Sequence, residues 1–368
     1  MQYRPAILLE RTNYTADETE KIDINFSDVC SRITVTYEPD NNPSGINATA
    51  HPARCIPKLE LVDGSDELYS LTGQECQACD FYDEGKLRTN IMCYLNGMRS
   101  EMIFNMNFGN FLWDENWAFD PQKFKNPQLK IQMDIDGGGD ESNDGYLTVL
   151  AHLFDEKIPS PRGLVMHKEH KTWTLVNATP EYSNLPTDYP YKQLFLRAQR
   201  YGTGPEYQID TIKLSENQDK KVPINGLTMF EVLRNIAAEW PAYEEWILVP
   251  GSTTVQYFYN TPCYWPTFVD TQWRADVATA EASCYVGDGG RFQHDAEASG
   301  PNHQIHVRGW APHAMVPLLP RFSIEPLEYY DVTKLGATQG ALRLSVKGAA
   351  DVGTAQTAEL VIQQYRNY

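Results

Sequence analysis

Long apolar segments are missing from the sequence. No uninterrupted apolar run approaches the ~20 residues that span a bilayer, and the first residues contain only the short apolar patch Ala6–Leu9. We therefore expect neither a membrane-spanning helix nor a secretory signal.

Basic residues are also scarce. Lys and Arg total 31 against 49 Asp and Glu, which gives a net charge of −18. Proteins that neutralise phosphates or coat anionic membranes need the opposite balance. The N-terminal part of the chain, up to Cys30, holds only Arg4, Arg11 and Lys21, so no basic arm is present there. We expect no direct sequence-specific binding of nucleic acid.

The seven cysteines are odd in number and unevenly spaced. This pattern does not indicate a secreted disulfide framework, and reduced thiols in a cytoplasm are the simpler interpretation. Phosphate-binding GxxxxGK[ST], GxGxxG on a strand, GxSxG and HExxH motifs are absent. The sequence therefore predicts no catalytic residue, no cofactor-binding residue and no enzyme activity.

Alternating apolar and β-branched residues dominate the first half of the chain. They are separated by turn-rich pieces, as in an antiparallel sandwich rather than in alternating β–α units. Eight candidate strands suggest a jelly roll: Glu20–Phe26, Ser31–Glu38, Lys58–Val62, Glu67–Leu71, Glu101–Phe108, Gln128–Ile135, Tyr146–Phe154 and His170–Val176.

Two short helices are predicted at related places. Thr72 with Glu75 forms a T-x-x-E capping box, and Thr228 with Glu231 repeats it in the second half of the chain. Apolar residues at helical spacing follow Thr228, and Pro241 ends that run.

A longer match supports an internal duplication. The strand–turn–strand segments beginning at Gln128 and at Ala341 align without a gap, so both strands of the hairpin share one offset. The sequence thus predicts an all-β chain of two tandem eight-stranded jelly rolls, each with a short helix. We expect the rolls at 1–177 and 191–368, with a Pro-rich linker at 178–190.

The offset between the hairpins is larger than the offset between the two capping boxes. The second roll should therefore carry a long loop insertion between its helix and its final hairpin. We expect it within about 257–339, where Trp, Pro, Gly and His are frequent. Such insertions project from a sandwich and often make contacts.

Two groups of residues could hold a metal, and whether either of them does so is left unknown. The acidic turn from Asp134 to Gly145, above all its Asp136–Asp144 part, offers oxygen donors for Ca²⁺, although it lacks the EF-hand order and a solvated hairpin is favoured. Cys76 and Cys79 could begin a zinc site completed by Cys93 or Cys55, against the alternative of two thiols packed under the sandwich.

Histidine and tryptophan groups receive structural interpretations. The histidines are expected as loop residues, with the His167–His170 pair in a connection before a strand. The tryptophans could stack on sugars, but positions in protein interfaces or in a small core of the insertion are favoured. These residues are His303, His306, His313, His167, His170, Trp265, Trp273 and Trp310.

This layout resembles a known family, the double jelly-roll major capsid proteins of icosahedral viruses, in particular of tailless bacteriophages of the corticovirus and tectivirus kind. The resemblance covers the whole chain. It rests on the architecture and on the segments Thr19–Ile24, Ser31–Tyr37, Asn126–Ile131, Tyr191–Arg197 and Leu360–Tyr368.

The resemblance implies a major capsid protein that forms a homotrimer with a pseudo-hexagonal outline. It implies contacts with neighbouring capsomers and with minor capsid or penton proteins, and an internal membrane beneath the shell in several relatives. The insertion would form a tower on the capsomer. The protein would be made in the host cytoplasm and reside in the virion capsid.

Other classes stay open. A tandem jelly-roll glycan-cleaving amidase would place acidic residues and Trp in a groove between the rolls, and a carbohydrate-binding sandwich or another virion component, such as a spike, is also compatible. Fold analogy alone does not separate these functions.

Overall fold

The computed structural model describes residues 2–41, 48–85, 90–138, 144–250, 256–271, 282–285, 289–296, 302–320, 329–336, 340–353 and 356–368. At 265–271, 282–285, 294–296 and 303 only the backbone is described. None of the described helices is long and apolar enough to cross a membrane.

The described residues of the first roll form eight strands in two sheets, with the order β1-β9-β3-β7 in one and β2-β8-β4-β5 in the other. Their bounds are β1 (Tyr3–Tyr14), β2 (Glu18–Asp23), β3 (Cys30–Pro39), β4 (Lys58–Asp63), β5 (Asp66–Leu71), β7 (Met102–Asn107), β8 (Pro127–Met133) and β9 (Gly145–Phe154).

The second roll repeats this order. Its sheets are β10-β23-β12-β21 and β11-β22-β13-β14. The bounds are β10 (Gly163–Thr174), β11 (Pro180–Asn184), β12 (Tyr191–Arg197), β13 (Ile209–Glu216), β14 (Lys221–Thr228), β21 (Met315–Pro317), β22 (Leu342–Gly348) and β23 (Thr357–Asn367). In both rolls the first sheet has the same order: the first strand lies beside the eighth, the eighth lies beside the third, and the third lies beside the sixth. The predicted double jelly roll is therefore confirmed.

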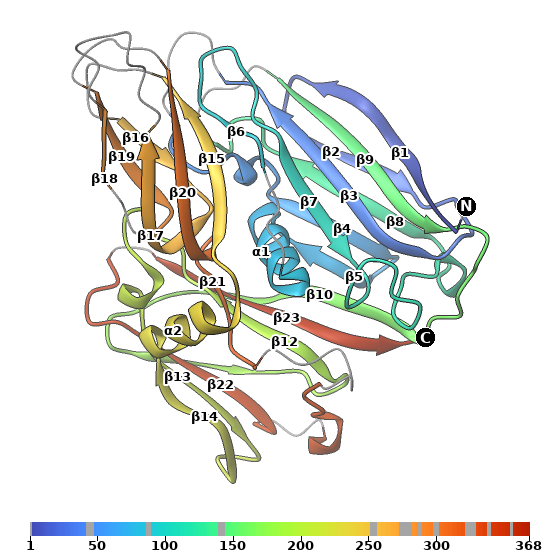
Figure 1. Cartoon of the computed structure of the whole chain (residues 1–368). Coiled ribbons are helices and arrows are strands. Elements are labelled where there is room, and N and C mark those ends of the chain that lie inside the picture. Colours follow the sequence, from blue (N-terminus) through green and yellow to red (C-terminus); the bar gives the residue numbers. More distant parts are fainter. Residues whose placement is uncertain are drawn as a thin grey trace.

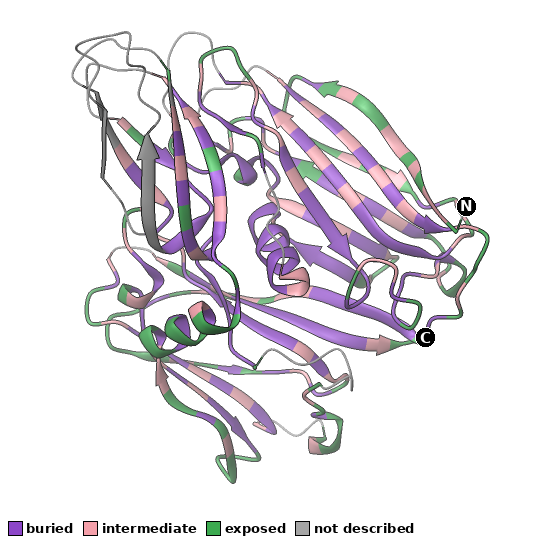
Figure 2. Ribbon diagram, in the orientation of Figure 1, coloured by how far each residue is buried: buried purple, intermediate pink, exposed green. Residues whose placement is uncertain are grey.

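The strands form because apolar residues alternate along them. In β8, Leu129, Ile131 and Met133 are buried while the residues between them are less buried. In β22, Leu342 and Leu344 are likewise buried and the residue between them is less buried. One connected core cluster extends through both rolls, and buried positions line the facing sides of the sheets (Figure 2).

The rolls lie side by side and share one long sheet (Figure 1). β5 of the first roll pairs in parallel with β10 of the second, Tyr69 opposite His167 and Ser70 opposite Lys168. This pairing joins two four-stranded sheets into one of eight strands, β2-β8-β4-β5-β10-β23-β12-β21.

Two expectations for the first half of the chain were wrong. The edge strand β1 was not predicted, and the segment expected as the eighth strand of the first roll is part of β10, which pairs over its length with β23 of the second roll. The His167–His170 pair accordingly lies within β10 and not in a connection. The boundary at residue 177 stays a prediction, although this pairing favours a division between Phe154 and Gly163.

One helix follows the fifth strand of each roll. It is α1 (Gly73–Glu84) in the first roll and α2 (Met229–Glu239) in the second. Thr72 and Thr228 cap them with complete capping boxes, as predicted. The connection from α1 to β7 covers only 85–101, whereas the one from α2 to β21 covers 240–314. The second roll therefore carries its extra chain between its helix and its final hairpin.

The described residues of the longer connection form six strands, which stand above the second roll (Figure 1). It begins with β15 at Tyr243, earlier than the expected residue 257. The six are β15 (Tyr243–Val249), β16 (Gln256–Tyr259), β17 (Pro262–Thr271), β18 (Ala282–Tyr285), β19 (Arg291–Ala296) and β20 (His303–Pro312). β6 (Met92–Cys93) of the first roll joins their larger sheet, β17-β20-β15-β6.

Candidate functional site at the junction of the two rolls

Helix α1 lies between the two rolls and is buried on almost every side. Ten of its 12 residues are buried, whereas α2 has four buried residues of 11. The helix begins where the Thr72 hydroxyl accepts a hydrogen bond from the Glu75 amide and the Glu75 carboxylate accepts one from the Thr72 amide. It ends at Gly85, whose φ of 61° suits glycine.

The last turn of α1 carries a buried charge cluster centred on Asp83. The Lys192 ammonium donates to Asp83 at 2.7 Å, the Gln363 amide at 3.0 Å, and the His167 ring lies 3.4 Å away. These partners come from β12, β23 and β10 of the second roll. Burial alone would raise the pKa of Asp83, but Lys192 and His167 outweigh it and lower the pKa to about 2.

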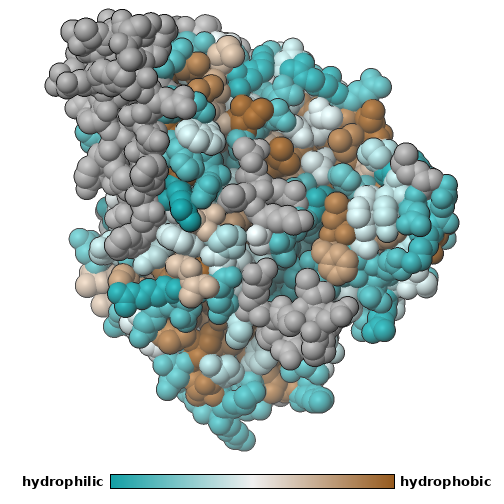
Figure 3. Space-filling view, in the orientation of Figure 1, coloured by the Kyte–Doolittle hydropathy of each residue, from teal (hydrophilic) through white to brown (hydrophobic). Residues whose placement is uncertain are grey.

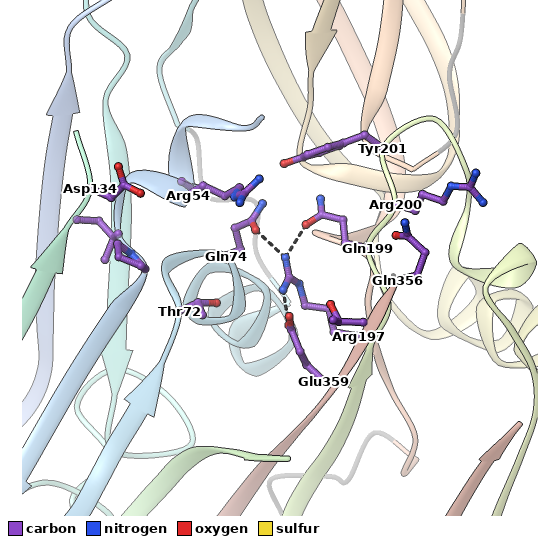
Figure 4. Close-up of a pocket in the computed structure, with 14 residues that line it drawn as sticks. Arg54, Thr72, Gln74, Asp134, Arg197, Gln199, Arg200, Tyr201, Gln356 and Glu359 are labelled. Carbon is purple, nitrogen blue, oxygen red and sulfur yellow. Dashed lines mark hydrogen bonds and ion pairs between the residues drawn. The ribbon is translucent and has the colours of Figure 1, made fainter. Parts of the chain in front are cut away.

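A second cluster surrounds Arg197 at the end of β12. Its guanidinium donates to Gln74 of α1 at 2.6 Å, to Gln199 at 2.5 Å and to Glu359 of β23 (Figure 4). It also donates to the backbone oxygen of His313 at 3.0 Å. Burial alone would lower the pKa of Arg197, but Glu359 and Glu75 raise it. The guanidinium is therefore a permanent charge whose donors are used within the junction.

This cluster lines a cavity of about 510 Å³ between the rolls. Arg54 and Asp134 of the first roll and Arg200 and Tyr201 of the second also line it (Figure 4). Glu75 follows the lining residue Gln74 in α1, and burial and the nearby Glu359 carboxylate raise its pKa to about 7. The junction thus combines buried charges of both signs.

A buried histidine pair links the insertion to the first roll. The rings of His51 and His313 meet edge to face with centroids 4.7 Å apart. His51 contacts the Thr261 hydroxyl at 3.1 Å, and that hydroxyl donates to Glu245 at 2.8 Å. Burial lowers the pKa of His51 to about 3 and raises that of Glu245 to about 7, and it also lowers the pKa of His313. Both histidines are therefore neutral structural groups near neutral pH.

Further contacts fasten the insertion to α1 and to β6. Tyr94 donates its hydroxyl to the Tyr259 backbone oxygen at 2.8 Å, and the Gln77 amide oxygen of α1 contacts the His313 ring at 2.8 Å. β6 pairs in parallel with β15. The insertion is therefore attached to both rolls.

The expected metal ligands do not come together in the described part of the chain, where no group of three His, Cys, Asp or Glu residues could hold a metal. Cys76 and Cys79 are buried in α1, and Cys76 receives a hydrogen bond from the Tyr69 hydroxyl at 3.1 Å. Cys55 and Cys93 are buried at other places.

Part of the acidic turn lies outside the described residues, namely 139–143. Of the residues that are described, Asp144 forms an ion pair with Arg99, and Asp134 accepts a hydrogen bond from the Asp136 amide at 3.2 Å. Asp144 is thus already paired with a cation of the protein.

The remaining histidines and tryptophans are dispersed. His306 stacks on Trp246 in the insertion, with ring centroids 4.5 Å apart, and His170 contacts the Asn184 backbone oxygen at 3.1 Å. Trp310 donates its ring N–H to the Trp240 backbone oxygen at 3.2 Å. The side chains of His303 and Trp265, and all of Trp273, lie outside the described residues.

Sequence reasoning did not find Asp83, Arg197 or Lys192. One signal was present: α1 contains four acidic residues and no basic residue, so any compensating cation must come from elsewhere in the chain. Such a helix with so few apolar positions is stable only where other elements pack around it.

Comparison of the sequence with protein-family models and with curated proteins finds no match. Solved structures do match, and they share the two-roll fold.

A chain in the atomic structure of Sulfolobus Turreted Icosahedral Virus is 12% identical, with a TM-score of 0.59 over 99% of this chain and 90% of that chain. The major capsid protein P2 of bacteriophage PM2 is 9% identical, with a TM-score of 0.54 over 100% and 98%. A chain of the PBCV-1 virus capsid is 10% identical, with a TM-score of 0.51 over 99% and 93%. At these identities the likeness shows the fold.

Proposed function

We propose that this chain is the major capsid protein of an icosahedral virus, resides in the virion and has a structural, non-enzymatic role. The observation that carries the proposal is the pair of rolls with the same strand order, joined in one sheet, in a fold that aligns over its full length with viral capsid proteins.

The chemistry of the junction supports a structural role over a glycan-binding one. The Arg197 donors are directed to Gln74, Gln199, Glu359 and the His313 backbone oxygen. A site for a sugar would aim such groups into the cavity for the ligand. Here they fasten one roll to the other.

The assembly that we propose is a homotrimer of pseudo-hexagonal outline, in which three pairs of rolls alternate around a ring. Its further partners are neighbouring capsomers and minor capsid or penton proteins, and the shell overlies an internal membrane. Covalent connection of two rolls halves the number of separate bodies that must associate.

Light scattering on the purified protein tests this proposal, because it should give three chain masses. Electron microscopy of particles from the producing source should then find regular shells rich in this chain. A stable monomer that hydrolyses a glycan would contradict the proposal. Lipid analysis of the purified particles tests the membrane separately.

A further inference from the structure

The two helices occupy the same place in their rolls but differ in exposure. Aligning the caps Thr72 and Thr228 places the exposed positions of α2 opposite buried positions of α1 (Figure 2). Five exposed residues, Phe230, Glu231, Arg234, Asn235 and Ala238, correspond to the buried Gln74, Glu75, Ala78, Cys79 and Tyr82, and a sixth, Glu239, corresponds to Asp83. The second roll covers these α1 residues, so α2 exposes the face that α1 buries.

Two sheet edges show the same difference. β5 and β10 pair in parallel where the rolls meet. The strand equivalent to β5 in the second roll is β14, and the strand equivalent to β10 in the first roll is β1. In the described part of the chain, each of these is the last strand of its sheet. They lie on distant sides of the molecule (Figure 1), so one chain cannot pair them with each other.

Strand register identifies the equivalent residues. Ile7 pairs with Leu150 in β9, and His167 pairs with Gln363 in β23. Leu150 and Gln363 correspond in the same ungapped alignment that places Gln128 opposite Ala341, so Ile7 occupies the place of His167. His167 is 1% exposed at the junction, whereas Ile7 is 64% exposed.

We propose that the β1 edge of one copy pairs in parallel with the β14 edge of a second copy of this chain, which thereby covers the exposed face of α2. The contact repeats the junction between the rolls of one chain, and it rests on the proposed capsid function. Such a head-to-tail contact uses two different surfaces of each copy and can close a ring.

The chemistry of the two surfaces is complementary. The register places Glu38 and Tyr146 of the first roll where Arg197 and Glu359 lie in the second. The Arg11 guanidinium lies 3.5 Å above the Tyr146 ring and also binds Glu38. In the proposed contact Phe230 and Glu231 of the neighbouring copy take the places of Gln74 and Glu75, which lie near Arg197 and Glu359 within one chain. Phe230 then faces Glu38 and Glu231 faces Tyr146, with the Arg11 guanidinium, which contacts both Glu38 and Tyr146, close to the Glu231 carboxylate.

The surface of the molecule agrees with a localised contact. On the face shown in Figure 3, hydrophobic side chains form small separate groups in a mostly hydrophilic surface. Copies with a net charge of −18 repel one another, and exposed Ile7 and Phe230 supply apolar area that offsets this repulsion.

Two variants and one control test the contact by light scattering. Ile7→Glu replaces the exposed apolar side chain of the β1 edge by a carboxylate, and Phe230→Glu does so on the exposed face of α2. Ile158→Glu is the matched control, because Ile158 is 65% exposed but lies in the connection between β9 and β10. Wild type and the control should be trimers with equal melting temperatures, and each test variant should be a folded monomer under the same conditions.

Mixing the two test variants gives a sharper result. The Ile7→Glu chain retains the α2 surface and the Phe230→Glu chain retains the β1 surface, so an equimolar mixture at high concentration should form dimers and no trimers, as measured by native mass spectrometry.

Trimers of Ile7→Glu or Phe230→Glu would overturn this inference and leave the capsid proposal intact. Two folded monomers that form no mixed dimer would also overturn the head-to-tail contact. A monomeric wild type would overturn both proposals. If one variant fails to melt cooperatively, the oligomeric state of the other decides.

Discussion

The Asp83 cluster should make a measurable contribution to the stability of the joined rolls. Asp83→Asn removes a carboxylate that is 3% exposed and leaves the Lys192 ammonium, 14% exposed, without its counter-charge. The pKa of Asp83 is lowered from 3.8 to about 2, which corresponds to about 2.5 kcal/mol at neutral pH. Uncompensated buried charges typically cost about 3–5 kcal/mol, so we expect a loss of about 3 kcal/mol at pH 7.

The sign of the pH dependence follows from the lowered pKa. The stabilisation by Asp83 is complete above its unfolded pKa near 3.8 and is lost as the pH falls through the folded value near 2. The difference between wild type and Asp83→Asn should therefore decline below pH 4.

Urea unfolding followed by tryptophan fluorescence at several pH values measures this difference. Glu115→Gln is the control, because Glu115 pairs with Lys157 at the surface, and that variant should unfold like wild type. Adding Lys192→Met to Asp83→Asn should recover part of the loss. A loss under about 1 kcal/mol at pH 7, or one that does not change down to pH 2, would refute the reasoning.

Three further predictions concern the caps, a buried acid and the thiols. Thr228→Ala should lower the free energy of unfolding, measured in urea, by about 1 kcal/mol. Thr72→Ala should lower it by about 2 kcal/mol, because water cannot replace the lost cap of the buried helix α1; equal losses for the two variants would contradict this. Glu245 has a raised pKa of about 7, so it reduces folded stability as the pH rises from 4.5 to 7, and Glu245→Gln should flatten the melting temperature over that range. Among the seven cysteines, six are buried, so a thiol reagent at pH 8 should modify at most Cys284 in native protein and all seven after unfolding.

Local patterns predicted the repeated parts of the fold well. The capping boxes at Thr72 and Thr228 and the hairpins beginning at Gln128 and Ala341 depend on neighbouring residues, and both were confirmed. The offset shared by both strands of the hairpins predicted two rolls, and its excess over the offset between the capping boxes predicted an insertion between α2 and the last hairpin.

Edge strands and insertions were harder to recognise. β1 contains Pro5, Glu10 and Arg11, which interrupt apolar alternation, because an edge strand facing water needs few apolar residues. The Tyr243–Val249 segment of the insertion alternates like any strand of a roll, and only its pairing with β20 assigns it to the insertion. No local pattern connects Asp83 with Lys192, because they belong to different rolls and lie far apart in the chain.

The differences between α1 and α2 follow from how each helix is covered. Within one chain the covering roll is held at high effective concentration, so polar contacts such as Gln74 with Arg197 and His167 with Asp83 are sufficient and favour one arrangement. Between copies, association must offset lost translational freedom and the mutual repulsion of acidic chains. Apolar side chains serve that need better, and in the equivalent places the sequence has Phe230 for Gln74 and Ile7 for His167. In the proposed contact the duplicated junction therefore exchanges polar partners for apolar ones.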